Sequence, residues 1–165
     1  MSSSAQEFRT SVVGYDGSDE ARAAVAVALD RSRAGDSIVI VHATPAASSW
    51  LGTPEYGRVV IEIQQTGQQV LDEMRPIAEQ VDRQVEFEML EGAPAEILIR
   101  VAAVRDADDI VVGSRGLGRL RAAALGSVSQ QLLRDADRPV LVVGPDAAAA
   151  VAAPVADDRV ALQLR

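Results

Sequence analysis

"DDIVVGSRGLGRLRAAALGS", residues 108–127, joins a short apolar run to a glycine-rich stretch that ends where a helix start is expected. The apolar run at residues 109–112 is typical of a strand buried in a parallel sheet. The glycines that follow let the backbone approach a ligand closely, because they carry no Cβ. A helix start near Gly126 adds unpaired N–H groups and the positive end of a helix dipole. Strand, glycine loop and helix start together predict a binding site for phosphate.

The rest of the chain repeats the order of a strand followed by a helix. Apolar runs predict four more strands, at residues 11–16, 37–43, 84–90 and 138–144, and the strictly alternating run 84–90 is typical of a sheet edge. Helical periodicity predicts helices at residues 19–34, 58–81, 92–105 and 127–136, the first of them capped by Ser18. The predicted fold is therefore an α/β domain with a doubly wound five-stranded parallel sheet and helices on both faces.

Length and composition limit the function classes. A chain of 165 residues is one domain by default, and its 48% hydrophobic residues suffice for a core although only 3% are aromatic. The net charge of −8 argues against nucleic acid or an anionic membrane as a partner. No run approaches about 18 apolar residues, and the N-terminal "MSSSAQEFRT" lacks the apolar stretch of a signal peptide. We therefore expect a cytoplasmic protein.

Missing residue types exclude several chemistries. The chain has no cysteine, so disulfides, cysteine-ligated metals and thiol nucleophiles are absent. It has no lysine, which excludes a Walker-type phosphate lysine and Schiff-base catalysis. His42 is the only histidine, and it continues an apolar strand, where a packed sheet residue is a better interpretation than a catalyst.

The spacing of the glycine loop points to a known family. Two residues separate Gly113 from Gly116, and nine residues separate Gly116 from Gly126, which Ser127 follows. This pattern, G-2x-G-9x-G-(S/T), resembles that of the ATP-binding branch of the universal stress protein family. "VVGYDGS", "GAPAEILI", "LGSVSQQLL" and "RPVLVVG" also resemble the family, in the same order. The resemblance implies a Rossmann-like fold, similar to the adenine nucleotide alpha hydrolases, over residues 10–145. Residues 1–9 are then a disordered N-terminus and residues 146–165 an Ala/Pro-rich tail.

The resemblance also implies a set of ligand-contacting residues. Around the base and ribose these are the backbone of Ala43, which reads the adenine edge, and Asp16 with the neighbouring Gly14 and Tyr15. On the ribose and α-phosphate side they are Val112, Gly113, Ser114, Arg115 and Gly116. N–H and hydroxyl groups of Gly126, Ser127, Val128 and Ser129 hold the phosphates, and Arg115 and Arg119 add positive charge there. Asp16 is also the carboxylate that would hold Mg²⁺ of a bound Mg-ATP.

Several of these residues have a second interpretation. Ser127 with Gln130 fits a helix capping box, S-x-x-Q. Asp16 fits a turn residue ahead of Gly17. The arginines and Gly118 fit a solvated connector. Both interpretations stay open for each residue on the sequence alone.

As a whole, the resemblance implies an ATP-binding regulator of the stress response with little or no turnover. It also implies a homodimer in which the strand from Pro139 to Val143 pairs with its symmetry mate; such an apolar edge strand invites pairing. Two alternatives remain. The first is a slow Mg-dependent ATPase like the related ATP-hydrolysing enzymes, although "GYDGSDE" does not match their S-G-G-x-D-S loop. The second is a nucleotide-free dimeric scaffold.

Overall fold

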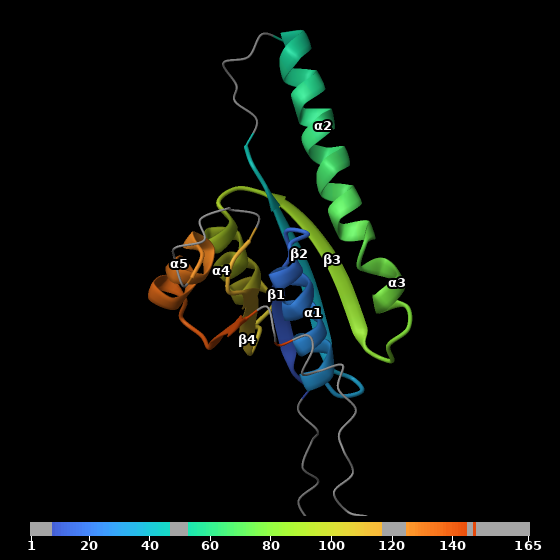
Figure 1. Ribbon diagram of the computed structural model, residues 1–165, viewed down its shortest axis with the longest axis vertical. Coiled ribbons are helices and arrows are strands. Elements are labelled where there is room, and N and C mark those ends of the chain that lie inside the picture. The colour runs from blue at the N-terminus through green and yellow to red at the C-terminus, as the bar shows by residue number, and fades with distance from the viewer. Residues whose placement is uncertain (1–7, 47–52, 117–124, 145–146, 148–165) are drawn as a thin grey trace, which may run out of the picture.

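The computed structural model describes residues 8–46, 53–116, 125–144 and 147 (Figure 1). Five parallel strands form one sheet in the order β3-β2-β1-β4-β5. The strands are β1 (Thr10–Gly14), β2 (Ser37–Thr44), β3 (Gln84–Glu91), β4 (Asp109–Gly113) and β5 (Val140–Val143). The helices are α1 (Asp19–Arg31), α2 (Thr53–Asp72), α3 (Arg75–Ala78), α4 (Pro94–Val104) and α5 (Ser127–Asp135). The doubly wound α/β fold is thus confirmed.

The sheet is buried on both faces because neighbouring strand residues point to opposite sides. On one face, Val13 and Ile40 pack against α1 and the end of α2. On the other, Val12, Val39 and Ile110 pack against α4 and α5. Strand order reverses between β1 and β4, so the chain leaves their adjacent carboxyl ends toward opposite faces of the sheet, and parallel sheets hold ligands at such a point.

Helix boundaries differ from the predicted ones at α2. The predicted helix 58–81 begins earlier, at Thr53, and ends at Asp72, and the short α3 follows as a separate turn. Pro76 explains the break, because a proline lacks the N–H and clashes with the carbonyl four residues before it, which belongs to Asp72. Beyond the carboxyl ends of the strands, the N-terminal half of α2 projects past the sheet (Figure 1).

The cap predicted for α1 is confirmed. Ser18 Oγ accepts a hydrogen bond of 3.2 Å from the N–H of Ala21, and Ser18 is itself buried. The helix ends at Arg31, three residues before the predicted end, and the chain then turns through Gly35 at a φ of +94°. A positive φ favours glycine, which explains why this short connection carries one.

The two edges of the sheet differ in character. β3 forms one edge, as its alternating sequence predicted, and its Glu86 and Glu88 pair with Arg105, the C-cap residue of α4. β5 forms the opposite edge with the uncharged side chains of residues 140–143. Charges on an edge strand discourage pairing with another chain, and an uncharged edge lacks this protection.

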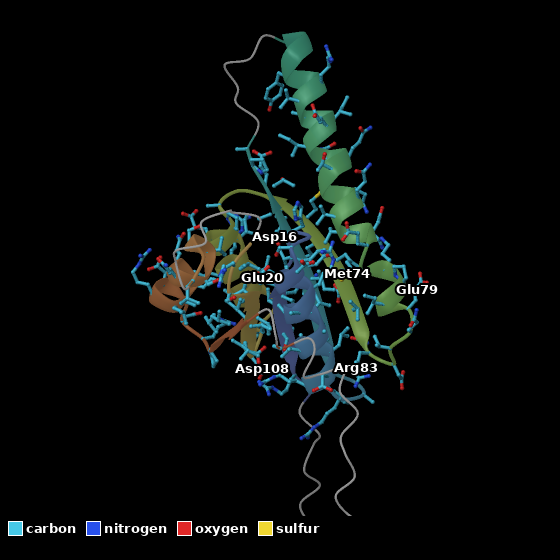
Figure 2. The ribbon with its side chains drawn as sticks, viewed as in Figure 1. Asp16, Glu20, Met74, Glu79, Arg83 and Asp108 are labelled. Carbon is cyan, nitrogen blue, oxygen red and sulfur yellow. The ribbon has the colours of Figure 1, made fainter. Side chains whose placement is uncertain are left out.

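The termini of the predicted domain lie partly outside the described residues. Residues 1–7, and residues 145–146 and 148–165 of the tail, belong to that part. Arg9 is described: its N–H donates to Asp36 Oδ1 at 2.9 Å, and its guanidinium pairs with the buried Asp109 at 3.3 Å. These contacts lie at the amino end of the sheet, near Asp108 and far from Asp16 (Figure 2).

Candidate functional site

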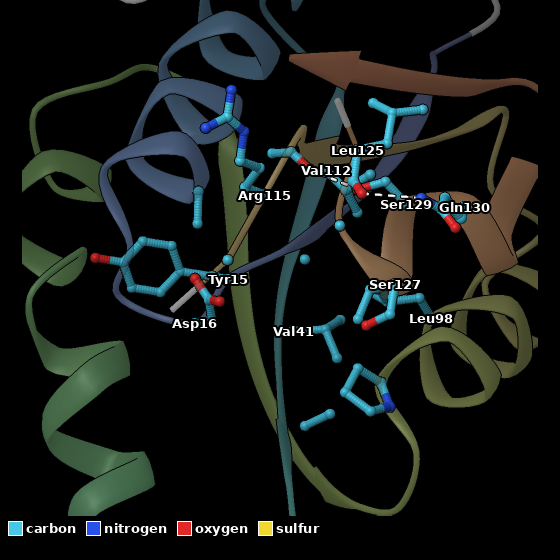
Figure 3. Close-up of a pocket in the computed structure, with 18 of the residues that line it drawn as sticks. Tyr15, Asp16, Val41, Leu98, Val112, Arg115, Leu125, Ser127, Ser129 and Gln130 are labelled. Atoms are coloured by element: carbon cyan, nitrogen blue, oxygen red, sulfur yellow. Dashed lines mark hydrogen bonds between the residues drawn. The ribbon is translucent and has the colours of Figure 1, made fainter. Parts of the chain in front are cut away.

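A pocket of about 470 Å³ opens at the carboxyl ends of the strands, at the point where the strand order reverses (Figure 3). Its walls come from the ends of β1, β2 and β4 and from the first turns of α4 and α5. A volume of this size is typical of small-molecule sites, which span about 300–1,000 Å³.

Most of the residues predicted for the site line this pocket. They are Gly14, Tyr15, Asp16, Ala43, Val112, Gly113, Arg115, Gly116, Gly126, Ser127, Val128 and Ser129. Ser114 is not a lining residue: it is buried, its N–H donates to the carbonyl of Val143 at 2.7 Å, and its own carbonyl accepts from Gly126 at 2.7 Å. Ser114 therefore ties the glycine loop to β5 and α5. Arg119 lies outside the described residues.

Other lining residues were not predicted. They are Ala21, Val41, His42, Pro94, Leu98, Leu125 and Gln130. Val41 and Leu98 are part of the apolar pattern of their strand and helix. That pattern is the same for a residue in the core and for one in a pocket wall, so it could not single them out. The sequence could have indicated the start of α4 as part of the pocket wall. "GAPAEILI" follows a strand, so this helix must begin at the carboxyl end of the sheet.

Asp16 closes one side of the pocket against the glycine loop. Its Oδ1 accepts a hydrogen bond of 3.0 Å from the N–H of Ser18, across Gly17 at a φ of +83°. A Cβ at Gly116 would overlap with Asp16 Oδ2. Asp16 is therefore a turn residue and a pocket residue at once, and its carboxylate lies directly against Gly116.

Gly113 lacks a side chain for a reason that the motif did not indicate. A Cβ at Gly113 would lie 2.7 Å from the carbonyl carbon of Glu20, in the backbone of α1. Real Cβ atoms do not approach backbone so closely, so this glycine lets α1 pack against β4. The sequence predicted that Gly113 lies close to a phosphate. In the structure, α1 occupies the space where a side chain of residue 113 would lie. At Gly126 the nearest atom is Arg115 Cα, at 3.3 Å.

The first turn of α5 does not form the capping box. The box requires Ser127 as the N-cap residue, but the N-cap is Gly126, one residue earlier, and glycine has no side chain to cap the helix. Gln130 Nε2 instead donates to the carbonyl of Leu125 at 2.9 Å. The first helical bond comes from the N–H of Gln130 to Gly126, so the N–H groups ahead of it have no acceptor within the helix.

The two serines of this turn have different environments. Ser129 is 2% exposed, and its hydroxyl donates to the carbonyl of Gly113 at 2.8 Å (Figure 3). Its proton is therefore used to hold β4 and α5 together. Ser127 is the first residue of the helix and lines the pocket. Of the two hydroxyls, that of Ser127 is the better placed to donate to a ligand.

Charged groups around the pocket are few among the described residues. Arg115 lines it, but its guanidinium points away from Ser127 in Figure 3, and its buried Nε has no hydrogen-bond partner within the described part of the chain. Those same ranges contain no group of three or more His, Asp or Glu side chains able to hold a metal ion. None of the helices they contain has the length and apolarity to span a bilayer.

His42 also lines the pocket. Its Nδ1 lies 2.8 Å from the carbonyl oxygen of Tyr15. Because a carbonyl oxygen only accepts, Nδ1 carries the proton in this contact and Nε2 is the remaining acceptor of the neutral ring. The ring is thus anchored to the backbone that precedes Asp16.

Fold and pocket together define an α/β protein that can hold a ligand at the switch point of a parallel sheet. The chain matches the model of the universal stress protein family over residues 7–144, and it belongs to that family. A universal stress protein of Thermus aquaticus is 36% identical over 137 residues, which cover 82% of this chain and 98% of the relative. One of Methanocaldococcus jannaschii is 32% identical over 139 residues and 82% of each chain.

Solved structures show the same architecture. Universal stress protein UspA from Lactobacillus plantarum matches with a TM-score of 0.71 at 18% identity, over 83% of this chain and 98% of that chain. A universal stress protein solved in complex with cAMP matches with a TM-score of 0.54 at 27% identity, over 84% of this chain and 98% of that chain. The likeness agrees with the parallel sheet described above.

Proposed function

We propose that the pocket binds an adenine nucleotide, and that this nucleotide is ATP. The proposal rests on one observation: three groups lie together at the carboxyl end of the sheet. They are the carboxylate of Asp16, the backbone at Gly116 and the N-terminus of α5. A helix N-terminus with unbonded N–H groups binds phosphate well. The cAMP bound to a structure 27% identical to this chain supports an adenine nucleotide as the ligand class.

In this proposal the ligand lies across the pocket, from the end of β2 to the start of α5. The backbone of Ala43 reads the adenine edge, and Asp16 lies by the ribose with Gly14 and Tyr15. The phosphates lie against the N–H groups of Ser127, Val128 and Ser129 and the hydroxyl of Ser127. Gly126 lines the same turn, but its N–H is bonded to the carbonyl of Ser114. Val112, Gly113 and Gly116 line the middle, with Arg115 and Arg119 as sources of positive charge.

A magnesium ion would enter with the phosphates. Asp16 would supply a hard carboxylate oxygen of the kind that Mg²⁺ prefers, and the bound ion would offset the negative charge of the phosphates. Among the described residues that line the pocket, Asp16 carries the one carboxylate, which suits an ion held mainly by oxygen atoms of the ligand.

We propose a nucleotide-dependent regulator of the stress response in the cytoplasm, with little or no turnover. Hydrolysis requires a group that activates water. Of the pocket's described residues, Asp16 and His42 are the ones able to take up a proton, and His42 has only Nε2 available. A steady release of ADP that disappears in Asp16→Ala would favour the slow ATPase instead.

A homodimer through β5 completes the proposal. The carbonyl oxygens of Pro139 and Val143 face β4, where they accept from Ile110 and Ser114 at 2.9 and 2.7 Å. The backbone N–H and C=O groups of successive residues point to opposite sides of a strand. Those of Val140 and Val142 therefore point away from β4, toward the open side of the sheet. These outward groups and the uncharged side chains fit pairing with a second copy.

The test is a calorimetric titration of nucleotide-free protein with Mg-ATP, AMP and cAMP. Micromolar binding of Mg-ATP, about −8 kcal/mol, is expected. Tighter binding of AMP or cAMP would retain the nucleotide site and change its ligand. Absence of heat with all three up to millimolar concentration would overturn the proposal in favour of the nucleotide-free scaffold.

A further inference from the structure

The pocket is connected to a helix that contributes nothing to its described walls. No residue of α2 is among the lining residues that the structure describes. The link is Tyr15, whose backbone comes between Gly14 and Asp16 at the pocket and whose ring is buried at 2% exposure. In Figure 3 its hydroxyl points away from Ser127 and Leu98, out of the pocket.

Every polar group of Tyr15 is bonded within the protein. Its N–H donates to the carbonyl of Val41 at 2.9 Å, and its carbonyl accepts from His42 Nδ1 at 2.8 Å. Its hydroxyl donates to Glu73 Oε2 at 2.9 Å. The first two bonds attach it to β2, and the third attaches it to the residue that directly follows α2.

Glu73 is held from the other side by α1. Arg22 Nη2 donates to Glu73 Oε2 at 2.7 Å, and Arg22 Nη1 donates to Asp19 at 3.0 Å. The hydrogen bond from Arg22, then that from Tyr15, lowers the pKa of Glu73. Burial and the bond to Glu73 raise the pKa of Tyr15 to about 12. At neutral pH the phenol is therefore a donor and Glu73 an anionic acceptor.

A second contact joins the same region to α2. A Cβ at Gly67 would lie 3.1 Å from His42 Cδ2 and 2.6 Å from Met89 Sδ, so α2 passes directly over the imidazole that holds the Tyr15 carbonyl. The turn from Tyr15 to Ser18 is thus held by β2 on one side and by the carboxyl half of α2 on the other.

We infer that Glu73 and Arg22 are positioning residues for the nucleotide site, and that they couple its occupancy to the carboxyl end of α2 through Tyr15. This inference rests on the proposed nucleotide binding. A loop that is already held in its binding geometry loses less conformational freedom when the ligand arrives. Because coupling between two sites is reciprocal, bound nucleotide must in turn stabilise the link to α2.

The experiment compares nucleotide affinities of single and double variants by calorimetry with Mg-ATP. Tyr15→Phe removes the hydroxyl and Glu73→Ala removes its acceptor; each is expected to weaken binding by about three- to tenfold. The double variant is expected to bind Mg-ATP no more weakly than the single variant of lower affinity, because the two substitutions remove the same hydrogen bond. Glu73→Gln, which keeps an acceptor oxygen, is expected to restore part of the affinity.

Asp72→Asn is the matched control. It removes a neighbouring exposed ion pair, with Arg75 at 2.6 Å, that has no connection to Tyr15, so its affinity should equal that of the parent. Additive losses in the double variant, or unchanged affinity in Tyr15→Phe, would overturn the inference while leaving the nucleotide site in place. A parent that binds none of the nucleotides would instead overturn the proposed function.

Hydrogen exchange of the unaltered protein gives a second test that needs no variant. Saturating Mg-ATP should slow exchange of the amides at residues 67–73 relative to those of α3, which has no bond to Tyr15. Unchanged exchange at residues 67–73, in a protein that calorimetry shows to be saturated, would contradict the coupling.

Discussion

The hydroxyl of Ser129 donates a hydrogen bond of 2.8 Å to the carbonyl oxygen of Gly113, and so joins the start of α5 to the end of β4. Ser129→Ala leaves that buried carbonyl without its partner. We expect a loss of about 1–3 kcal/mol in the free energy of unfolding, measured by urea denaturation of the nucleotide-free protein.

Ser127→Ala is the matched change two residues away. Its hydroxyl makes no helix cap, so the free energy of unfolding should change little, whereas ATP affinity should fall by about 1–3 kcal/mol if the hydroxyl donates to phosphate. The reverse pattern, with Ser129 governing affinity and Ser127 governing stability, would show that the two roles are exchanged.

Gly113→Ala should destabilise the protein even without nucleotide. The added methyl group would meet the backbone of Glu20 at 2.7 Å, and a helix backbone cannot rotate away as a side chain does. We expect a loss of about 1–3 kcal/mol from such overpacking, seen as a lower melting temperature.

Gly57→Ala serves as the control for that substitution. It makes the same chemical change inside α2, where nothing lies within 4 Å of the added Cβ. Alanine is favoured over glycine in a helix by about 0.5–1 kcal/mol, so this variant should be slightly more stable than the parent. A Gly113→Ala protein as stable as the parent would mean that α1 can shift away from β4.

Apolar runs predicted the strands well because burial on both faces leaves a strong local signal. The error at α2 came from tracking periodicity through Pro76, whose ring conflicts with the carbonyl of Asp72. The apolar spacing in residues 58–81 continues beyond the end of α2, but α3 buries none of its residues and its Ile77 is 43% exposed.

The parts of the site that a local sequence pattern identifies were predictable. Glycine spacing identified the loop and the start of α5, yet it gave no reason for Gly113, because the neighbour that excludes a side chain there is Glu20, in another element. Likewise the bonds from Tyr15 to Glu73 and to His42 span 58 and 27 residues. Contacts of that range depend on how the elements pack, and no local pattern encodes them.

Val142→Pro tests the proposed dimer. The N–H that it removes points away from β4, so the bonds within the subunit remain, and proline is tolerated on an edge strand. We expect light scattering to show a dimer for the parent and a monomer for this variant.

Val142→Ala is the control for the dimer, since it also shortens the side chain but keeps the outward N–H. It should remain a dimer with somewhat lower stability. A Val142→Pro protein that stays dimeric would place the interface elsewhere on the molecule.

The pKa of Tyr15 predicts how stability changes at alkaline pH. Burial and the bond to Glu73 raise that pKa to about 12 from its ordinary value of 10.0, so the folded state holds the proton more tightly than the unfolded state. The resulting stability is fully present below pH 10 and is lost as the pH rises toward 12. Urea unfolding at pH 9 and pH 11 should show a loss of about 1 kcal/mol in the parent, beyond that of Tyr15→Phe.

Tyr56→Phe makes the alkaline experiment specific. Tyr56 is 38% exposed on α2 and no bond to Glu73 involves it, so this variant should keep the full alkaline loss of the parent. If Tyr15→Phe lost as much stability between pH 9 and pH 11 as the parent, the loss would come from other groups. Because the same hydroxyl is what ties the pocket to α2, the bond to Glu73 would then be too weak to position the site.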